Sequence, residues 1–150
     1  RMAVVNLSGN LYIGAPLGAF QTIDPLLAEI LEDVKLIVLD FHAEATSEKV
    51  AMGHYLDGRV TAVIGTHTHV QTADARVLPK GTAYITDAGM TGPRNSVIGV
   101  DKQIILQRFL TQMPARFEVA EGDVWIEGVL VTADDQGRAT AIESLQVEQR

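Results

Sequence analysis

Short apolar runs recur through the first half of the chain, and each is bounded by glycine, aspartate or asparagine. Runs of this length, rich in β-branched and aliphatic residues, are typical of strands buried on both faces of a parallel sheet. The pattern therefore predicts strands at residues 3–7, 36–40, 60–64 and 83–86.

The segment between the first two predicted strands has the pattern of a helix. In "DPLLAEILEDV", Asp24 is placed to act as the N-cap, and Pro25 suits the first helical position. The apolar side chains fall on one face, as expected for a helix that packs against a sheet. They are Leu26, Leu27, Ile30 and Leu31.

A second helix is expected between the next two strands, in "SEKVAMGHYLDG". Ser47 would cap its start, and Gly58 would end it. The order of elements is then strand, helix, strand, helix, strand. This order predicts a parallel α/β core whose crossover connections are helical.

The pattern becomes helical again over residues 101–111, and Pro114 ends that helix. Its apolar positions are Ile104, Ile105, Leu106, Phe109 and Leu110. The tail, residues 116–147, alternates apolar and polar positions and has turn residues at 121–122 and 135–137. It therefore predicts an antiparallel meander after the parallel core, within one α/β domain.

Composition narrows the range of partners. The 150 residues are 47% hydrophobic and 21% charged, which fits a soluble globular domain. The net charge is -7, and lysines and arginines are scattered, so duplex nucleic acid is not expected as a partner. The absence of cysteine leaves imidazole, carboxylate and amide groups as metal ligands.

The start of the chain and its hydropathy bear on where in the cell the protein is expected. We find no apolar run long enough to span a bilayer and no export signal, so no membrane association is expected and a cytoplasmic setting is compatible. The chain begins with "RMAVVNLSGN" and enters a predicted strand almost at once. We therefore expect it to be part of a longer protein.

Three of the four histidines follow predicted strands directly. His42 comes after the strand at 36–40, and His67 and His69 come after the strand at 60–64. The carboxyl ends of neighbouring parallel strands meet at one edge of a sheet, where ligands bind, so the three imidazoles could share a metal ion.

The spacing of His67 and His69 alone leaves two interpretations open. In extended backbone the two side chains would point the same way, toward one metal or two neighbouring metals. They could equally hydrogen-bond loop carbonyls. The additional histidine at a neighbouring strand end, His42, favours the metal.

Other polar residues have weaker claims. His54 lies inside a predicted helix and is expected to be a surface or packing residue. Asp40 and Glu44 flank His42 and could orient its ring, although acidic residues beside a strand end are commonly only solvated. Asp87 could be a second carboxylate of the site, but a structural role is favoured.

The strings "FHAEATSEK" and "GTHTHVQTAD" closely resemble the YmdB-type branch of the calcineurin-like metallophosphoesterases, and the likeness extends through "RFLTQMPARFEVAEG" to the C-terminal strands. The resemblance implies a four-layered α/β/β/α sandwich. It also implies a dinuclear site, with iron or manganese favoured over zinc, that hydrolyses 2',3'-cyclic and 3',5'-cyclic nucleotides. Carried over by motif, His42, His67 and His69 would be metal ligands.

The resemblance also implies that part of the site lies elsewhere. Family members have an N-terminal half that supplies further metal ligands and the histidine that acts on the leaving group. Residues 1–150 therefore correspond to the C-terminal part of one metallophosphoesterase domain, and no catalytic proton donor can be assigned within them. Pairing with an N-terminal half, or association of identical chains, is compatible with this.

Two other functions remain open at this point. The three histidines could hold a single zinc ion with water in the fourth position, as in mononuclear hydrolases. Alternatively, the chain could be a catalytically incomplete interaction module with one sheet face uncovered. Metal stoichiometry separates the mononuclear from the dinuclear hydrolase, and exposed apolar surface would distinguish the interaction module.

Overall fold

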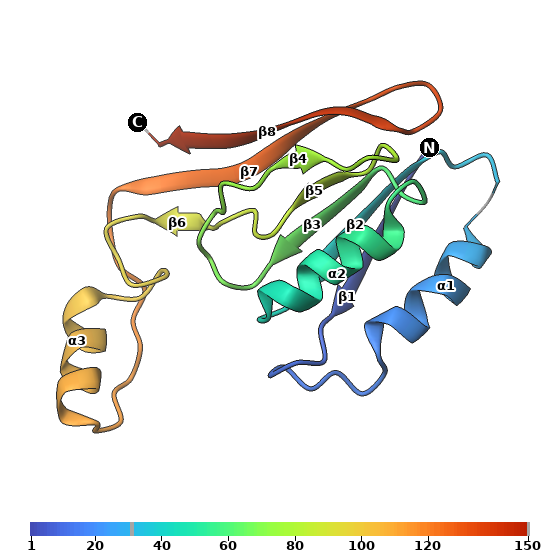
Figure 1. Cartoon of the computed structure of the whole chain (residues 1–150). Coiled ribbons are helices and arrows are strands. Elements are labelled where there is room, and N and C mark those ends of the chain that lie inside the picture. The colour runs from blue at the N-terminus through green and yellow to red at the C-terminus, as the bar shows by residue number, and fades with distance from the viewer. Residues whose placement is uncertain (31, 150) are drawn as a thin grey trace.

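The first sheet has five strands in the order β1-β2-β3-β5-β4, and the computed structural model describes residues 1–30 and 32–149 (Figure 1). Strands β1, β2, β3 and β5 are parallel, while β4 is antiparallel to β5. Their bounds are β1 Met2–Ser8, β2 Leu36–His42, β3 Ala62–Thr66, β4 Arg76–Val77 and β5 Ala83–Ile85. The four strands predicted from the apolar runs are therefore confirmed.

The second sheet is antiparallel and contains β6 (Thr91–Pro93), β7 (Val124–Ala133) and β8 (Ala139–Glu148) in that order. The predicted hairpin turn lies between β7 and β8 and is confirmed. The strand predicted before β7 is wrong, because that segment contributes only an isolated bridge between Val100 and Val119. Its place beside β7 is taken by β6.

Helix α1 spans Ala19–Glu29, so the predicted start at Asp24 is wrong. The helix begins earlier because Ala19 and Ile23 are buried in the core, and Pro25 is accommodated inside it. Asp24 does not cap the helix; its carboxylate accepts hydrogen bonds from Tyr55 and Arg59. Leu31, predicted on the apolar face, lies outside the described residues.

The other two helices agree more closely with the sequence. Helix α2 spans Thr46–Leu56, and Gly58 follows its end with a φ of +82°, although Ala45 rather than Ser47 occupies the N-cap. Helix α3 spans Lys102–Thr111, and its N-cap is Asp101.

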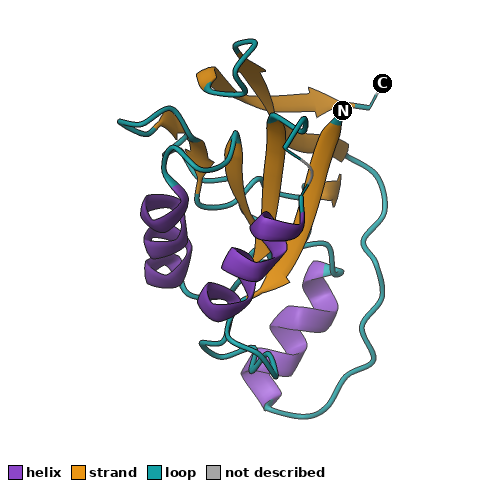
Figure 2. Cartoon of the chain, turned by 90° about the vertical axis from the view of Figure 1, so that its right-hand side faces the viewer, coloured by secondary structure: helices purple, strands orange, loops and turns teal. Residues whose placement is uncertain are grey.

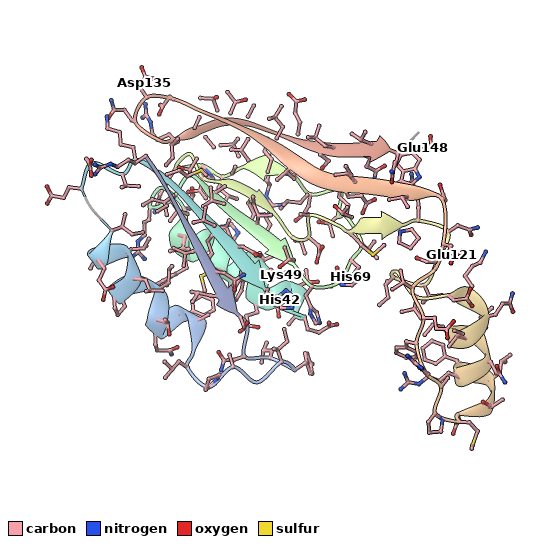
Figure 3. The ribbon with its side chains drawn as sticks, turned by 180° about the vertical axis from the view of Figure 1, so that it is seen from behind. His42, Lys49, His69, Glu121, Asp135 and Glu148 are labelled. Atoms are coloured by element: carbon pink, nitrogen blue, oxygen red, sulfur yellow. The ribbon has the colours of Figure 1, made fainter. Side chains whose placement is uncertain are left out.

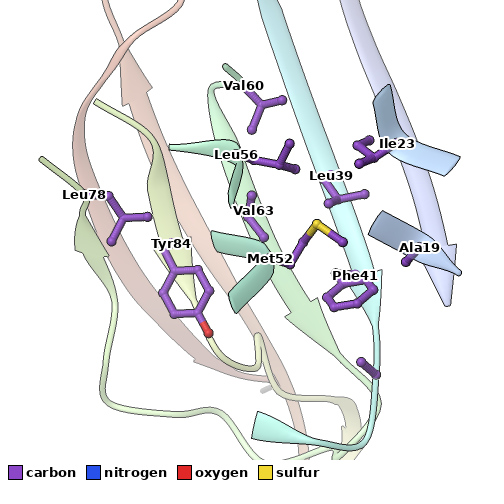
Figure 4. Close-up of a cluster of buried hydrophobic side chains, with 11 residues drawn as sticks. Ala19, Ile23, Leu39, Phe41, Met52, Leu56, Val60, Val63, Leu78 and Tyr84 are labelled. Atoms are coloured by element: carbon purple, nitrogen blue, oxygen red, sulfur yellow. The ribbon is translucent and has the colours of Figure 1, made fainter. Parts of the chain in front are cut away.

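The molecule is built in layers. Helices α1 and α2 cover one face of the five-stranded sheet, and the β7–β8 hairpin lies across part of the other face (Figures 1 and 2). The main core fills the helix side, where Phe41, Met52 and Tyr84 are fully or almost fully buried (Figure 4). A smaller core around Ala62, Ala83 and Ala139 joins the two sheets. These layers confirm the expected α/β sandwich class.

Helix α3 lies apart from the layered body (Figure 1). Of the apolar face predicted for it, only Ile105 is buried, whereas Phe109 and Leu110 are 73% and 84% exposed. None of the helices in the described part of the chain has the length and apolarity needed to span a bilayer.

Candidate metal and active site

The candidate site lies at the carboxyl ends of β2 and β3. The parallel register of these strands sets His42, the last residue of β2, beside Thr66, the last residue of β3. His67 follows at once, so the predicted histidines are brought to one edge of the sheet. Figure 3 shows His42 and His69 at this edge, with Lys49 of α2 beside them.

His42 and His67 face each other. Nε2 of His42 lies 3.0 Å from Nδ1 of His67, and the rings meet edge to face with centroids 4.7 Å apart. Two nitrogens bound at right angles to one ion, each at about 2.1 Å, would be about 3.0 Å apart. The observed spacing therefore fits two ligands of a single metal ion.

The tautomer of His42 follows from its neighbours. The hydroxyl of Thr66 donates to Oδ1 of Asp40 at 2.8 Å, so Oγ1 of Thr66 can only accept from His42 Nδ1, 3.1 Å away. Asn6 donates from Nδ2 to the other carboxylate oxygen of Asp40 at 2.8 Å. In its neutral form, His42 therefore carries its proton on Nδ1 and presents the lone pair of Nε2 to His67.

His67 is fixed in a similar way. Its Nε2 lies 2.9 Å from a carboxylate oxygen of Glu44, which can only accept. Nε2 must then be the donor, and in the neutral imidazole this leaves Nδ1 to supply a lone pair toward His42. Two lone pairs 3.0 Å apart repel each other unless a proton or a metal ion lies between them. The pair thus has the chemistry of a cation-binding site.

The supporting carboxylates do not act as expected from the sequence. Asp40 reaches His42 only through Thr66, a residue that sequence reasoning did not select. Glu44 contacts His67 rather than His42. Asn6 lies within β1 and donates a hydrogen bond to Asp40.

His69 does not join the pair in this structure. Its Nδ1 lies 2.9 Å from the carbonyl oxygen of Ile98, and its side chain is exposed. Among the described residues, we find no group of three or more His, Asp or Glu side chains arranged to hold a metal ion. The structure therefore brings together two of the three histidines predicted as ligands.

The backbone explains why His67 and His69 diverge. The sequence interpretation assumed an extended backbone, but φ is +110° at His67 and +65° at His69. Such values are uncommon for residues other than glycine and persist only where surrounding structure enforces them. The strained loop therefore points to a strong local anchor.

That anchor is Asp87. Its Oδ2 accepts from the backbone N–H and the hydroxyl of Thr68, at 2.9 and 2.7 Å, and from Nζ of Lys49 at 2.9 Å. Its Oδ1 accepts from the N–H of Gly89 at 3.0 Å. Burial raises the pKa of Asp87, but these hydrogen bonds outweigh it and hold the pKa below its usual value. The structural role favoured for Asp87 agrees with these contacts.

Lys49 was missed by sequence reasoning although a signal was present. Its side chain is only 1% exposed, and it occupies the same helical face as the buried Met52, Gly53 and Leu56. A lysine three, four and seven residues before core positions lies on a buried stripe, where an unpaired charge is strongly unfavourable. Such a lysine requires a carboxylate partner.

Two clefts lie at opposite ends of the strands. A cleft of about 530 Å³ lies at the amino ends, where it is lined by Arg1, Met2 and Leu36, away from the histidines. A cleft of about 490 Å³ is lined by His69 and by residues of β7 and β8. Only the second adjoins the candidate site.

Comparison with known proteins gives a consistent result. The model of a family described as YmdB-like protein matches residues 1–145. A curated Bacillus subtilis (strain 168) protein named 2',3'-cyclic-nucleotide 2'-phosphodiesterase is 52% identical over 148 residues. The alignment covers 98% of this chain and 56% of the Bacillus protein, so the chain spans little more than half of that relative.

Two solved structures are similar to the chain. A hypothetical protein from Thermus thermophilus superposes with a TM-score of 0.91 at 43% identity, over 98% of this chain and 57% of that one. A structure described as a novel phosphatase from Mycoplasma pneumoniae superposes with a TM-score of 0.87 at 37% identity, over 97% of this chain and 52% of that one.

Proposed function

Because this chain belongs to the family of YmdB-like proteins, we propose that it supplies the histidine part of a metal-dependent phosphodiesterase that acts on cyclic nucleotides. The name of the Bacillus relative supports the reaction, and the phosphatase from Mycoplasma supports the class of chemistry. The observation that carries the proposal is the pair of lone-pair nitrogens on His42 and His67, 3.0 Å apart at a sheet edge.

The proposed cofactor is a pair of divalent or trivalent ions, iron or manganese, with zinc as an alternative. His42, His67 and His69 would be ligands, and the remaining ligands would come from chain outside these 150 residues. When bound, such ions lower the pKa of a coordinated water and neutralise charge on the phosphoryl oxygens.

The residues of this chain have distinct tasks in the proposal. Asp40, through Thr66, keeps the proton of His42 on Nδ1, so that Nε2 remains a lone pair. Glu44 holds the proton of His67 on Nε2 in the same way. His69 would have to leave the carbonyl oxygen of Ile98 before its Nδ1 could act as a ligand.

Replacing His67 with alanine tests the proposal. In the full-length protein, we expect the variant to lose bound metal and to hydrolyse 2',3'-cyclic nucleotides more than about 100-fold more slowly, because loss of a ligand should exceed the effect of losing an outer hydrogen-bond partner. Metal content would be measured by mass spectrometry after purification with manganese, beside the hydrolysis rate.

The matched control is His54→Ala, because His54 is an exposed histidine on α2 away from the pair. It should keep both metal and activity. Two ions per wild-type protein, lost only in the His67 variant, support the proposal. One ion indicates a mononuclear hydrolase, and an active protein whose metal content does not respond to His67→Ala contradicts the ligand assignment.

Thr66→Val tests the positioning of His42. Valine keeps the shape of threonine in β3 but removes the hydroxyl that links His42 to Asp40, so we expect metal affinity to fall about 10- to 100-fold. Competition with a chelator would measure the affinity. Thr140→Val, at an exposed position of β8, should leave it unchanged. Equal affinity in both variants would remove the role given to Thr66.

A further inference from the structure

The cleft beside His69 has features of a binding site that the histidine pair does not explain. Its volume of about 490 Å³ lies within the range of small-molecule sites. Its lining includes the apolar side chains of Val70, Val97 and Ile98 and polar side chains of β7 and β8. An amphipathic ligand of modest size would satisfy both kinds of side chain.

Arg94 and Trp125 form the most distinctive element of this cleft. The guanidinium of Arg94 lies 4.4 Å from the centroid of the Trp125 ring, in cation–π geometry. No carboxylate of the described chain lies within ion-pairing distance of Arg94, whose side chain is exposed. The flat cation is held by a ring, not by an anion, so its charge and its planar surface remain available to a ligand.

The polar groups of the cleft are held in place by their neighbours. Gln71 donates from Nε2 to the carbonyl oxygen of Gly128 at 2.9 Å. Glu127 accepts from the N–H of Met90 at 3.2 Å and from Nε2 of Gln146 at 3.0 Å. Side chains fixed in this manner give a preformed site that loses little freedom on binding.

We propose that this cleft binds the nucleoside part of the substrate, with the base resting against the Arg94–Trp125 stack. Bases are recognised by stacking on aromatic rings and on arginine planes, and the apolar part of the lining suits the ring of a base better than it suits a phosphate. His69 links the two regions, because it lines the cleft and is separated by one residue from His67. The assignment rests on the proposed phosphodiesterase function.

Kinetics with two substrates test the proposal in the full-length protein. A 2',3'-cyclic nucleotide carries a base, whereas glycerol 1,2-cyclic phosphate has the same five-membered cyclic diester without one. For Arg94→Gln and Trp125→Leu, we expect KM for the nucleotide to rise about tenfold or more with kcat unchanged. Hydrolysis of the glycerol compound should not change.

Two controls separate stacking from general damage. Trp125→Phe keeps an aromatic face and should recover most of the nucleotide affinity. Arg108, on α3, makes a similar cation–π pair with Phe117 at 4.8 Å outside the cleft, so Arg108→Gln should have no effect. Equal losses on both substrates, or a loss in the Arg108 variant as large as that in the Arg94 variant, would overturn the proposal.

Binding of a nucleotide to the cleft can also be measured without turnover. With 5-fluorotryptophan incorporated and the Trp125 signal assigned by Trp125→Phe, adenosine 3'-phosphate should shift that ¹⁹F resonance, and inorganic phosphate should not. A shift with a protein that hydrolyses neither substrate would support the cleft and refute the phosphodiesterase. Hydrolysis without a nucleotide-specific shift would refute the cleft alone.

Discussion

Replacing Lys49 with methionine is expected to lower the free energy of unfolding by about 3–5 kcal/mol, because the change leaves the carboxylate of Asp87 buried without its cation. Lys49 and Asp87 are 1% and 0% exposed, and their charged atoms are 2.9 Å apart. Methionine preserves most of the volume of the lysine stem, so the loss would report the charge and not a cavity. Urea denaturation of the full-length protein measures this loss in the free energy of unfolding.

The loss of stability in the same variant should become smaller at acid pH. The lowered pKa of Asp87 means that its contribution to stability is fully present above its ordinary value of 3.8 and is lost as the pH falls through the lowered pKa. Lys49 is one of the groups that lower that pKa. Without it, the pKa of Asp87 rises, so protonation of Asp87 costs the variant less stability, and the difference between the variant and the wild-type protein becomes smaller as the pH falls through the wild-type pKa.

The exposed pair Arg59–Asp24 supplies the control. Both side chains are substantially exposed, at 39% and 48%, and Arg59→Met should change the free energy of unfolding by less than about 1 kcal/mol. If Lys49→Met were as mild as Arg59→Met, the buried pair could not be the anchor that holds the histidine loop. A large loss would identify Asp87 as the residue on which the strained loop depends.

The parallel core and the position of the histidines could be predicted because they depend on local patterns. Apolar runs define the buried strands, and the direction of parallel strands sends the residues after each run to one edge. His42 and His67 therefore meet, although no contact between them can be read from the sequence.

The finer parts of the site depend on register and on distant residues. Thr66 reaches both His42 and Asp40 only because β2 and β3 pair in a particular register. The positive φ angles of His67 and His69 depend on Asp87, which is far along the chain. Hydrophobic periodicity and secondary-structure propensity carry no information on such long-range contacts. The extended loop expected from the His-x-His spacing was therefore wrong.

The C-terminal region shows the same limit for strands. Residues 116–120 have strand-like alternation, but β6 pairs with β7 in their place. β6 contains a glycine and a proline and is three residues long, and these features conceal a strand in a sequence pattern. Local propensity favours residues 116–120 as a strand over residues 91–93, but pairing in the folded protein places residues 91–93 beside β7.

Replacing Gly65 with alanine is expected to destabilise the protein about as much as Lys49→Met does. A Cβ at Gly65 would lie 1.7 Å from the carbonyl oxygen and 2.6 Å from the carbonyl carbon of Thr86. These are backbone atoms of the segment that follows β5, so the strands must separate for the side chain to fit. We expect a loss of about 3 kcal/mol or more in the free energy of unfolding, at the upper end for overpacking.

The Gly65 substitution should also disturb the histidine pair, because Gly65 is close to His67 in the chain. Gly65 accepts a hydrogen bond from the N–H of Ala88 at 2.9 Å, and it lies two residues before His67. Gly128→Ala is the matched control, because a Cβ there meets no atom within 4 Å. Chemical denaturation of both variants should show a large loss for Gly65 only. If Gly65→Ala were as stable as Gly128→Ala, β3 and the segment after β5 would not be as closely apposed as described, and the anchoring of His67 through Asp87 would lose its structural basis.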